Sequence, residues 1–371
     1  MLSYKNLSVV GSLLAVTLLS CTKLDEGLRS SLTSAQTASA LGSAGTQLLL
    51  QAAYTDIGTP FCGDQGQVLS LEENSSDISL VPTRGGDWDD NGSWRIIHAH
   101  QFNSNDANTL NTFNNLNKLN FDATNVLAFK PAATQAAQAR FLRALSLYTL
   151  LDLFGEYPVR QPGDNLLNAP QVKAGADAIQ FIIDELTAAL PDLPAGGHAN
   201  MSVANQDAAK VLLMKAYLNK GAFANRANPT FDDADLTQVV TLGNQIISSG
   251  NYSYMAEYFD NFSVTNSNST EGIFAYANHT GTSAGNSGIN TRWFMTLHYN
   301  QYTPDNPNAG WNGFSTVADF YNSFGVPTLL DASNPKLSDT LVDKRLGRRF
   351  YPGVTDKSGQ RPGLMIGQQF N

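Results

Sequence analysis

The residues best suited to recognise a ligand lie in the last third of the chain, where aromatic side chains alternate with polar ones. Flat rings suit the apolar faces of pyranose sugars, and amides, carboxylates and guanidinium groups suit their hydroxyls. The aromatic residues are Trp293, Phe294, Tyr299, Tyr302 and Trp311, interleaved with Asn290, Arg292, Asn300, Gln301, Asp305 and Asn312. Each aromatic residue taken alone is better explained by core packing than by ligand binding. Together they predict a sugar-binding surface.

Trp311 differs from the other aromatic residues in its surroundings. It lies in the segment Asn308-Ala309-Gly310-Trp311-Asn312-Gly313, which offers little apolar support for a buried indole. We therefore expect Trp311, Asn312 and Trp293 to contact a ligand, with Tyr299 behind them and Trp88 as a further candidate.

Composition indicates a globular binding protein with a neutral, hydrogen-bonding surface. The chain has 371 residues, of which 42% are apolar and only 15% charged. The net charge of −9 excludes a general nucleic-acid binder, because such proteins neutralise phosphates with clustered Lys and Arg. The one short basic cluster, Lys344 to Arg349, does not change this conclusion.

No constellation of catalytic residues is recognisable. The sequence contains no G-x-S-x-G motif, no paired-cysteine metal spacing and no phosphate-binding glycine loop followed by Lys. Two carboxylates for glycoside hydrolysis exist in any chain with 32 acidic residues, so their presence decides nothing. We predict a protein that is not an enzyme and has no cofactor.

Two sequence patterns could indicate a metal-binding site. Asp87, Asp89, Asn91 and Gly92 match the first half of a calcium loop, but His98 occupies the twelfth position, where a bidentate Glu is required. His98 and His100 could be metal ligands if they lay two apart on a strand, but no carboxylate or third ligand stands at suitable spacing. We predict a structural role for these residues and no metal site.

The N-terminal segment predicts export and lipidation. Lys5 precedes an apolar run from Val9 to Leu19 that has the length of a signal-peptide core and is too short for a permanent membrane helix. Leu18-Leu19-Ser20-Cys21 resembles a bacterial lipobox, so residues 1–20 are predicted as a signal peptide and Cys21 as the lipidated residue. The alternative is an ordinary secreted protein. Residues 21–43 are predicted to form a flexible tether, and Cys62, left without a partner, is expected to pack in the core.

Helical periodicity dominates residues 44–250, the predicted scaffold. The stretch from Gln135 to Pro158 carries apolar residues on more than one face, so we expect it inside a helical layer, ending at Gly155. Further helices are predicted at Leu41–Ile57, Asn108–Phe129, Ala176–Leu190, Gln206–Lys220 and Asp232–Ser249, and a loop over 161–175. Such pairs suit tetratricopeptide-like stacking, since one pair alone cannot bury its apolar faces. Residues 251–371 lack this periodicity and are predicted as a loop-rich, aromatic-rich ligand-binding region.

Two long segments carry a family resemblance. Ala139 to Val159 (ARFLRALSLYTLLDLFGEYPV) closely resembles the most characteristic segment of the SusD/RagB family, the surface nutrient-binding lipoproteins of Bacteroidetes-type bacteria. Val81 to His100 (VPTRGGDWDDNGSWRIIHAH) is similar to a segment of one large branch of that family, and weaker similarity runs from Cys21 to about Gly353. The resemblance implies a mainly α, tetratricopeptide-like fold and, for Trp311, a place near the ligand face.

The resemblance also implies a function and partners. It indicates a lipoprotein at the outer-membrane surface that captures a glycan and acts as the lid of a SusC-like TonB-dependent transporter. The alternatives are a peptide or glycopeptide binder of the same family, a hydrolase, and a structural repeat adaptor. The chain stops at Asn371 without the further stretch that most family members carry, so we expect the ligand-binding region to be incomplete.

Overall fold

The structure is a computed structural model that describes residues 34–63, 65–256, 258–263, 265–277, 295–297, 299, 301–302, 310–324, 345 and 355–356. Contacts divide the chain into two compact units, 1–42 and 43–371. Helix α2 (Ser34–Thr55) contains Gly42 at φ 49° and ψ −146°, which interrupts its helical geometry. The predicted tether, 21–43, is therefore helical from Ser34. The predicted signal peptide and Cys21 lie outside the described residues.

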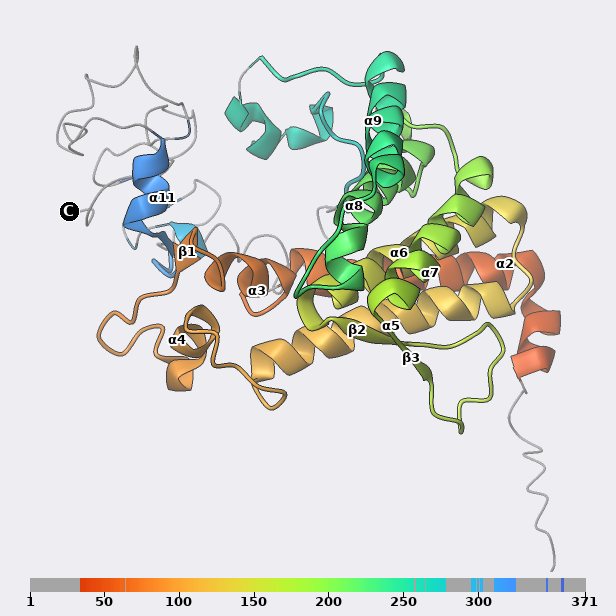
Figure 1. Cartoon of the computed structure of the whole chain (residues 1–371), viewed down its shortest axis with the longest axis horizontal. Helices are drawn as coiled ribbons and strands as arrows, with labels where there is room; N and C mark the ends of the chain where they lie inside the picture. Colours follow the sequence, from red (N-terminus) through yellow and green to blue (C-terminus); the bar gives the residue numbers. More distant parts are fainter. Residues whose placement is uncertain are drawn as a thin grey trace, which may run out of the picture. The chain divides into compact units, whose positions relative to one another are not determined.

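Helices make up most of the second unit up to residue 248, and Figure 1 follows them along the chain. After α2 come η1 (Gly58–Cys62), α3 (Val68–Asn74), β1 (Ser79–Leu80), η2 (Asp90–Gly92), α4 (Ser93–His98), α5 (Ala107–Ala128), α6 (Ala133–Phe154), β2 (Glu156–Val159), β3 (Gln171–Ala174), α7 (Gly175–Ala189), η3 (Leu190–Asp192), η4 (His198–Asn200), α8 (Gln206–Ala224) and α9 (Asp233–Ser248). The described elements beyond residue 250 are short: η5 (Tyr258–Phe262), η6 (Asn266–Asn268), β4 (Gln301–Tyr302), β5 (Ser315–Thr316), α11 (Ala318–Ser323) and β6 (Thr355–Asp356).

Side chains and glycines fix the ends of the long helices. The carboxylates of Asp106 and Asp232 and the amide of Asn205 accept hydrogen bonds from backbone N–H groups in the first turns of α5, α9 and α8. Gly155 ends α6 with φ 79°, a conformation that a residue with a Cβ rarely adopts. The helices predicted from periodicity are thus confirmed, with their ends shifted by a few residues.

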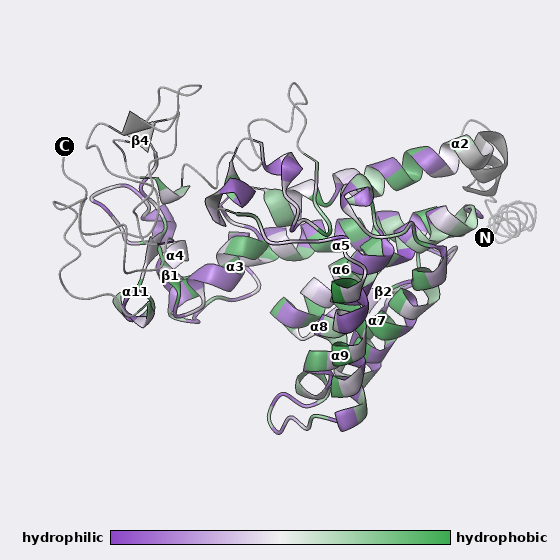
Figure 2. Ribbon diagram, turned by 90° about the horizontal axis from the view of Figure 1, so that it is seen from above, coloured by the Kyte–Doolittle hydropathy of each residue, from purple (hydrophilic) through white to green (hydrophobic). Residues whose placement is uncertain are grey.

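Helix α6 is the central element of the scaffold. It packs against α5, α7 and α8, and α7, α8 and α9 follow one another in the same way. Apolar side chains on several of its faces are almost completely buried, including Phe141, Leu142, Leu147 and Leu150. In Figure 2, apolar and polar residues alternate along these helices, as expected for helices that bury one side against a neighbour. The chain is mainly α with tetratricopeptide-like helix pairs, as predicted.

Two local predictions were wrong. The expected loop over 161–175 contains β3, which pairs antiparallel with β2 in the register Glu156↔Ala174. Pro158 obscured β2 in the sequence, because Pro lacks the N–H of an ordinary strand residue. Helix α8 continues past Gly221, where a Cβ would collide with the backbone oxygen of Thr230. That glycine permits a close approach of two backbones and does not end the helix.

Two short strand pairs involve the segments that follow residue 300, and one of them joins such a segment to the rest of the unit. β1 pairs antiparallel with β5, with Ser79 opposite Thr316 and Leu80 opposite Ser315. β4 pairs with β6 through Gln301 and Asp356. The first pair links the segment before α4 to a segment more than 200 residues later, and the candidate site is built beside it.

Candidate functional site

A tight turn precedes the helix that carries Trp94. Arg84 and Asp87 exchange two backbone hydrogen bonds of 3.0 Å, so Gly85 and Gly86 form a two-residue turn between them. Gly85 has φ +64°, which explains a glycine at this position. Trp88 follows the turn directly, and α4 begins five residues later, at Ser93. The turn is thus a tight connection into the helix that holds Trp94.

The structure brings Trp88 and Trp311 together. The indole N–H of Trp88 donates a hydrogen bond of 2.7 Å to the backbone oxygen of Trp311, across 223 residues of sequence. Trp311 is 37% exposed, whereas Trp88 and Asn312 are half-buried. Gly313 packs so closely on the Trp88 ring that a Cβ there would collide with it. Two of the predicted ligand-binding tryptophans therefore belong to one surface.

Trp88 rests on a small cluster of aromatic and apolar side chains. Its ring centroid lies 5.8 Å from that of Trp94 and 6.5 Å from that of Phe314, with tilted or edge-on geometry. Trp94 is buried, and Leu153 and Phe154 at the end of α6 pack against the same cluster. The end of the central helix α6 thus packs against the same cluster as Trp88.

Tyr299 reaches the same place through Asp87. Its hydroxyl donates a hydrogen bond of 2.6 Å to the Asp87 carboxylate, next to Trp88 in sequence. Burial raises the pKa of the Tyr299 hydroxyl, and the bond to Asp87 raises it further, so the phenol stays protonated at neutral pH. We call Trp88, Tyr299, Trp311 and Asn312 the aromatic patch.

The segment that carries Trp311 is held from two sides. The N–H groups of Asn312 and Gly313 donate to the backbone oxygens of Leu297 and Met295, each at 2.8 Å. On the other side, the guanidinium of Arg84 donates to the Gly313 oxygen at 3.2 Å and to the Ser315 hydroxyl at 2.8 Å. Burial lowers the pKa of Arg84, while the nearby Tyr299 opposes that shift.

Unfavourable backbone geometry occurs in the patch and in the chain next to it. Among the described residues, six non-glycine residues have positive φ: two are patch residues, Trp88 (61°) and Asn312 (53°), and two, Asp90 (39°) and Asn91 (55°), follow shortly after Trp88. A bulky residue such as Trp seldom adopts this conformation unless the surroundings enforce it. Such strain is typical of functional sites, where it helps to hold groups in place.

The acidic and histidine residues considered as metal ligands have protein partners. Asp89 forms an ion pair of 2.9 Å with Arg95, and Asp90 accepts the indole N–H of Trp94. A ring nitrogen of His98 lies 3.2 Å from the backbone oxygen of Asn74, and His100 contacts that of Ser75. His98 ends α4, so the two histidines do not lie on a strand as a metal pair would require. In the part of the chain that the structure describes, no three His, Cys, Asp or Glu side chains are grouped to hold a metal.

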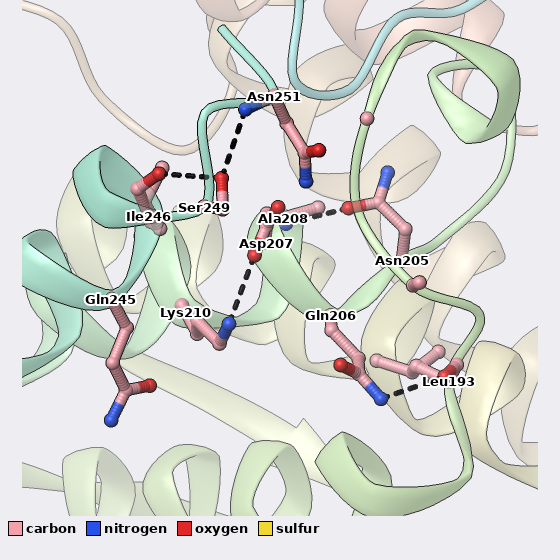
Figure 3. Close-up of polar contacts among 12 residues, drawn as sticks. Leu193, Asn205, Gln206, Asp207, Ala208, Lys210, Gln245, Ile246, Ser249 and Asn251 are labelled. Atoms are coloured by element: carbon pink, nitrogen blue, oxygen red, sulfur yellow. Dashed lines mark hydrogen bonds and ion pairs between the residues drawn. The ribbon is translucent and has the colours of Figure 1, made fainter.

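A second polar cluster lies at the start of α8 and has a structural role. Figure 3 shows Asn205 bonding the N–H of Ala208 and Asp207 paired with Lys210 at 3.0 Å. The Asp207 carboxylate, almost fully buried, also accepts a hydrogen bond from Tyr252. These partners account for the buried charge and fix the segment after α9 to the start of α8.

The remaining two residues with a sequence prediction, Trp293 and Cys62, have different outcomes. Trp293 lies outside the described residues. Cys62 is half-buried in η1, so the expectation of full core packing was wrong.

The structure also identifies Arg84, Asp87, Gly313 and Phe314 around the patch, which sequence reasoning did not assign to a ligand site. Their hydrogen bonds and packing contacts to the patch join distant segments, and the sequence carries no periodic signal for such contacts.

Comparisons with known proteins indicate one family. No model of a known protein family matches the sequence. The starch-binding protein SusD of Bacteroides thetaiotaomicron is 26% identical over 140 residues, which are 38% of this chain and 25% of SusD. A laminarin-binding SusD-like protein superposes with a TM-score of 0.61 at 18% identity, over 76% of this chain and 64% of its own.

A further solved structure agrees with this assignment. The surface glycan-binding protein A of Bacteroides thetaiotaomicron, in complex with laminarihexaose, superposes with a TM-score of 0.58 at 18% identity. It is covered over 60% of its length, and this chain over 76%. The chain thus spans less than two thirds of each of these proteins. The chain thus has the fold of the SusD-like proteins, and part of its sequence is similar to SusD, in agreement with the resemblance. These relatives are named for binding, in agreement with the prediction that the chain is not an enzyme.

Proposed function

We propose that this protein captures a glycan on the aromatic patch. The observation that carries the proposal is the bond between the Trp88 indole and the Trp311 backbone, which joins two partly exposed tryptophans on one surface. Their ring faces suit the apolar faces of sugar rings, and the Asn312 amide and Tyr299 hydroxyl suit sugar hydroxyls. Trp293, close to Tyr299 in sequence, is included in the proposed site.

The names of the similar proteins support a glycan as the ligand. SusD is a starch-binding protein, and the solved neighbours include a laminarin-binding protein and a glycan-binding protein in complex with laminarihexaose. Both named classes are glucose polymers, so starch and laminarin are the first glycans to test. Peptides and glycopeptides are a second ligand class, to be tested if no glycan binds.

We further propose delivery of the captured glycan to a transporter. In this proposal the protein is a lipoprotein of the outer-membrane surface, anchored through Cys21, and it closes a SusC-like TonB-dependent transporter as a lid. The lipobox-like sequence before Cys21 and the similarity to SusD support it. Among the described residues no helix is both long and apolar enough to cross a membrane. Residues 44–250 would then be the scaffold and 251–371 the ligand-binding region.

Affinity-gel retardation tests the proposed capture. The protein without residues 1–21 is run through gels containing starch, laminarin or other plant, microbial and host polysaccharides, beside Trp311→Ala. Tyr254→Ala is the matched control, because Tyr254 is 94% exposed and lies outside the patch. Retardation on one glycan class that Trp311→Ala abolishes and Tyr254→Ala retains is the expected result. A folded protein that no glycan retards contradicts glycan capture.

The membrane and transporter parts have separate tests. Replacing Cys21 with Ala in the full-length protein should move it from the membrane fraction to the soluble fraction, if lipidation anchors it. Co-purification of a SusC-like transporter with the wild-type protein from native membranes tests the lid role. A Cys21→Ala variant that stays in the membrane fraction contradicts the anchor.

A further inference from the structure

We infer that Arg84 and Asp87 are positioning residues of the aromatic patch. The inference rests on the proposed glycan capture and adds two residues that act through their neighbours. Both lie at the ends of one two-residue turn, and their side chains bond to two different segments that carry patch residues. The turn therefore fixes the relative places of Trp88, Tyr299 and Trp311.

Arg84 holds the segment of Trp311. Its guanidinium group makes three hydrogen bonds, to the oxygens of Pro82, Gly313 and Ser315, at 3.2, 3.2 and 2.8 Å. Two of these acceptors flank Phe314, which packs against Trp88. A planar group with several donors in fixed directions suits this task better than an ammonium group. Loss of Arg84 removes the direct side-chain link between the turn and this segment.

Asp87 holds Tyr299 from the other end of the turn. The carboxylate accepts the Tyr299 hydroxyl at 2.6 Å and thereby orients the ring. Tyr299 lies between Leu297, whose oxygen accepts the Asn312 N–H, and β4, which begins at Gln301. The bond thus draws a second distant segment to the turn.

Trp88 follows Asp87 directly and depends on both links. Its φ of 61° is costly for a bulky residue, and its indole bonds to the Trp311 oxygen. Arg84 bonds the Gly313 oxygen, and Gly313 in turn packs closely on the Trp88 ring, so Arg84 restricts where that ring can lie. A surface ordered before binding loses less conformational entropy when the ligand arrives, so these links are expected to raise affinity without touching the glycan.

The first test compares Arg84→Gln with Arg95→Gln. Arg95 is a neighbouring arginine that bonds to Thr83 and Asp89 and to no patch residue. We expect Arg84→Gln to bind the glycan identified by the gel roughly 2- to 10-fold more weakly, with Arg95→Gln close to the wild type. Arg84→Lys should recover only part of the loss. Equal affinity of Arg84→Gln and the wild type, in folded protein, overturns the role of Arg84.

The second test is a double-mutant cycle on Asp87 and Tyr299. If Asp87 acts only by orienting Tyr299, then Asp87→Ala should weaken binding in the wild-type background and cause no further loss in the Tyr299→Phe background. If instead Asp87 bonds the glycan itself, the losses multiply, and its assignment as a positioning residue is wrong. Thermal midpoints of all variants show whether the scaffold remains folded.

A third readout needs no ligand. The Trp88 indole N–H is hydrogen-bonded, so its exchange with solvent, followed by NMR, should be slow in the wild type and several-fold faster in Arg84→Gln. Unchanged exchange in this variant contradicts the inference even if no glycan binds. If exchange changes while the wild type binds no glycan, the proposed function fails and the positioning role stands.

Discussion

The helical scaffold and the aromatic patch are built from different kinds of contact. Helices α5 to α9 pack in sequence order around one large apolar core, so most neighbours in space are neighbours along the chain. The patch instead joins residues 84–88 to residues 299–315, through backbone and side-chain hydrogen bonds over more than 200 residues. Its own buried cluster is small: Leu71, Val81, Trp94 and Ile97.

The difference separates stability from recognition. Loss of a core side chain in the scaffold removes apolar burial, whereas loss of a patch contact leaves that core intact and changes the arrangement of a few side chains. Scaffold variants should therefore change the free energy of unfolding with little effect on affinity. Patch variants should do the reverse.

The largest effect is expected in the core of α6. Leu147 is fully buried, and Leu147→Ala should lower the free energy of unfolding by about 2–5 kcal/mol through lost burial and the cavity left behind. Urea unfolding followed by far-UV circular dichroism measures the change. Leu218→Ala on α8 is the control, because Leu218 is 48% exposed. A similar loss in both variants contradicts the assignment of α6 as the central element.

Alkaline pH should unfold the scaffold. Burial is the main cause that raises the pKa values of Tyr54 and Tyr148 from 10.0 to about 12, and it also raises that of Tyr157. The folded state therefore favours the protonated phenols. The stability they contribute is fully present below pH 10 and is lost as the pH rises toward 12.

Two spectra followed during one pH titration check this prediction. Absorbance at 295 nm reports tyrosinate, and far-UV circular dichroism reports helix. Part of the tyrosinate signal should appear together with the loss of helix. Complete ionisation of every tyrosine near pH 10 with the helices intact would show that these phenols are not protected.

Adding a single methyl group at Gly313 should weaken glycan binding by the patch. Gly313→Ala places a Cβ against the Trp88 ring, so the indole must move away from Trp311. We expect glycan affinity to fall roughly tenfold, while the helical melting temperature changes little. Gly86→Ala is the control, because a Cβ at that position meets nothing within 4 Å. If both variants bind like the wild type, the close packing of Trp88 is not needed for capture.

The smallest effect is expected in a comparison of two unfolding probes. All four tryptophans, Trp88, Trp94, Trp293 and Trp311, lie outside helices α5 to α9, so tryptophan emission reports residues outside these helices. Because the patch has the smaller core, its emission change should have a slightly lower urea midpoint than the loss of helix. Coincident midpoints in the wild type would mean that patch and scaffold unfold as one cooperative unit.

The two regions also differ in how far the sequence predicts them. Apolar spacing and the stop at Gly155 were sufficient to place the scaffold helices, because each signal acts within a few residues. The β2–β3 hairpin was missed because Pro158 weakens the signal of its first strand. Gly221 was taken for a helix end, since only the fold shows that Thr230 approaches it.

For the patch, sequence reasoning supplied the residues and the fold supplied their arrangement. Trp311 and Asn312 were chosen for their polar, glycine-rich surroundings, and Trp88 was named only as a further candidate. Their contact depends on bonds such as that from Arg84 to Gly313, which leave no periodic trace in either segment. Whether these residues bind a glycan stays a prediction.

Hydroxyl-radical footprinting with mass spectrometry tests glycan capture on the patch most directly, because it needs no substitution. The protein is oxidised with and without the glycan that the gel identifies, and modification of Trp88, Trp311 and Tyr254 is compared. We predict that the glycan slows oxidation of Trp311 and Trp88 and leaves Tyr254, which is 94% exposed, unchanged. Binding that leaves both tryptophans oxidised at the original rate, with protection elsewhere, would contradict the assignment of the patch.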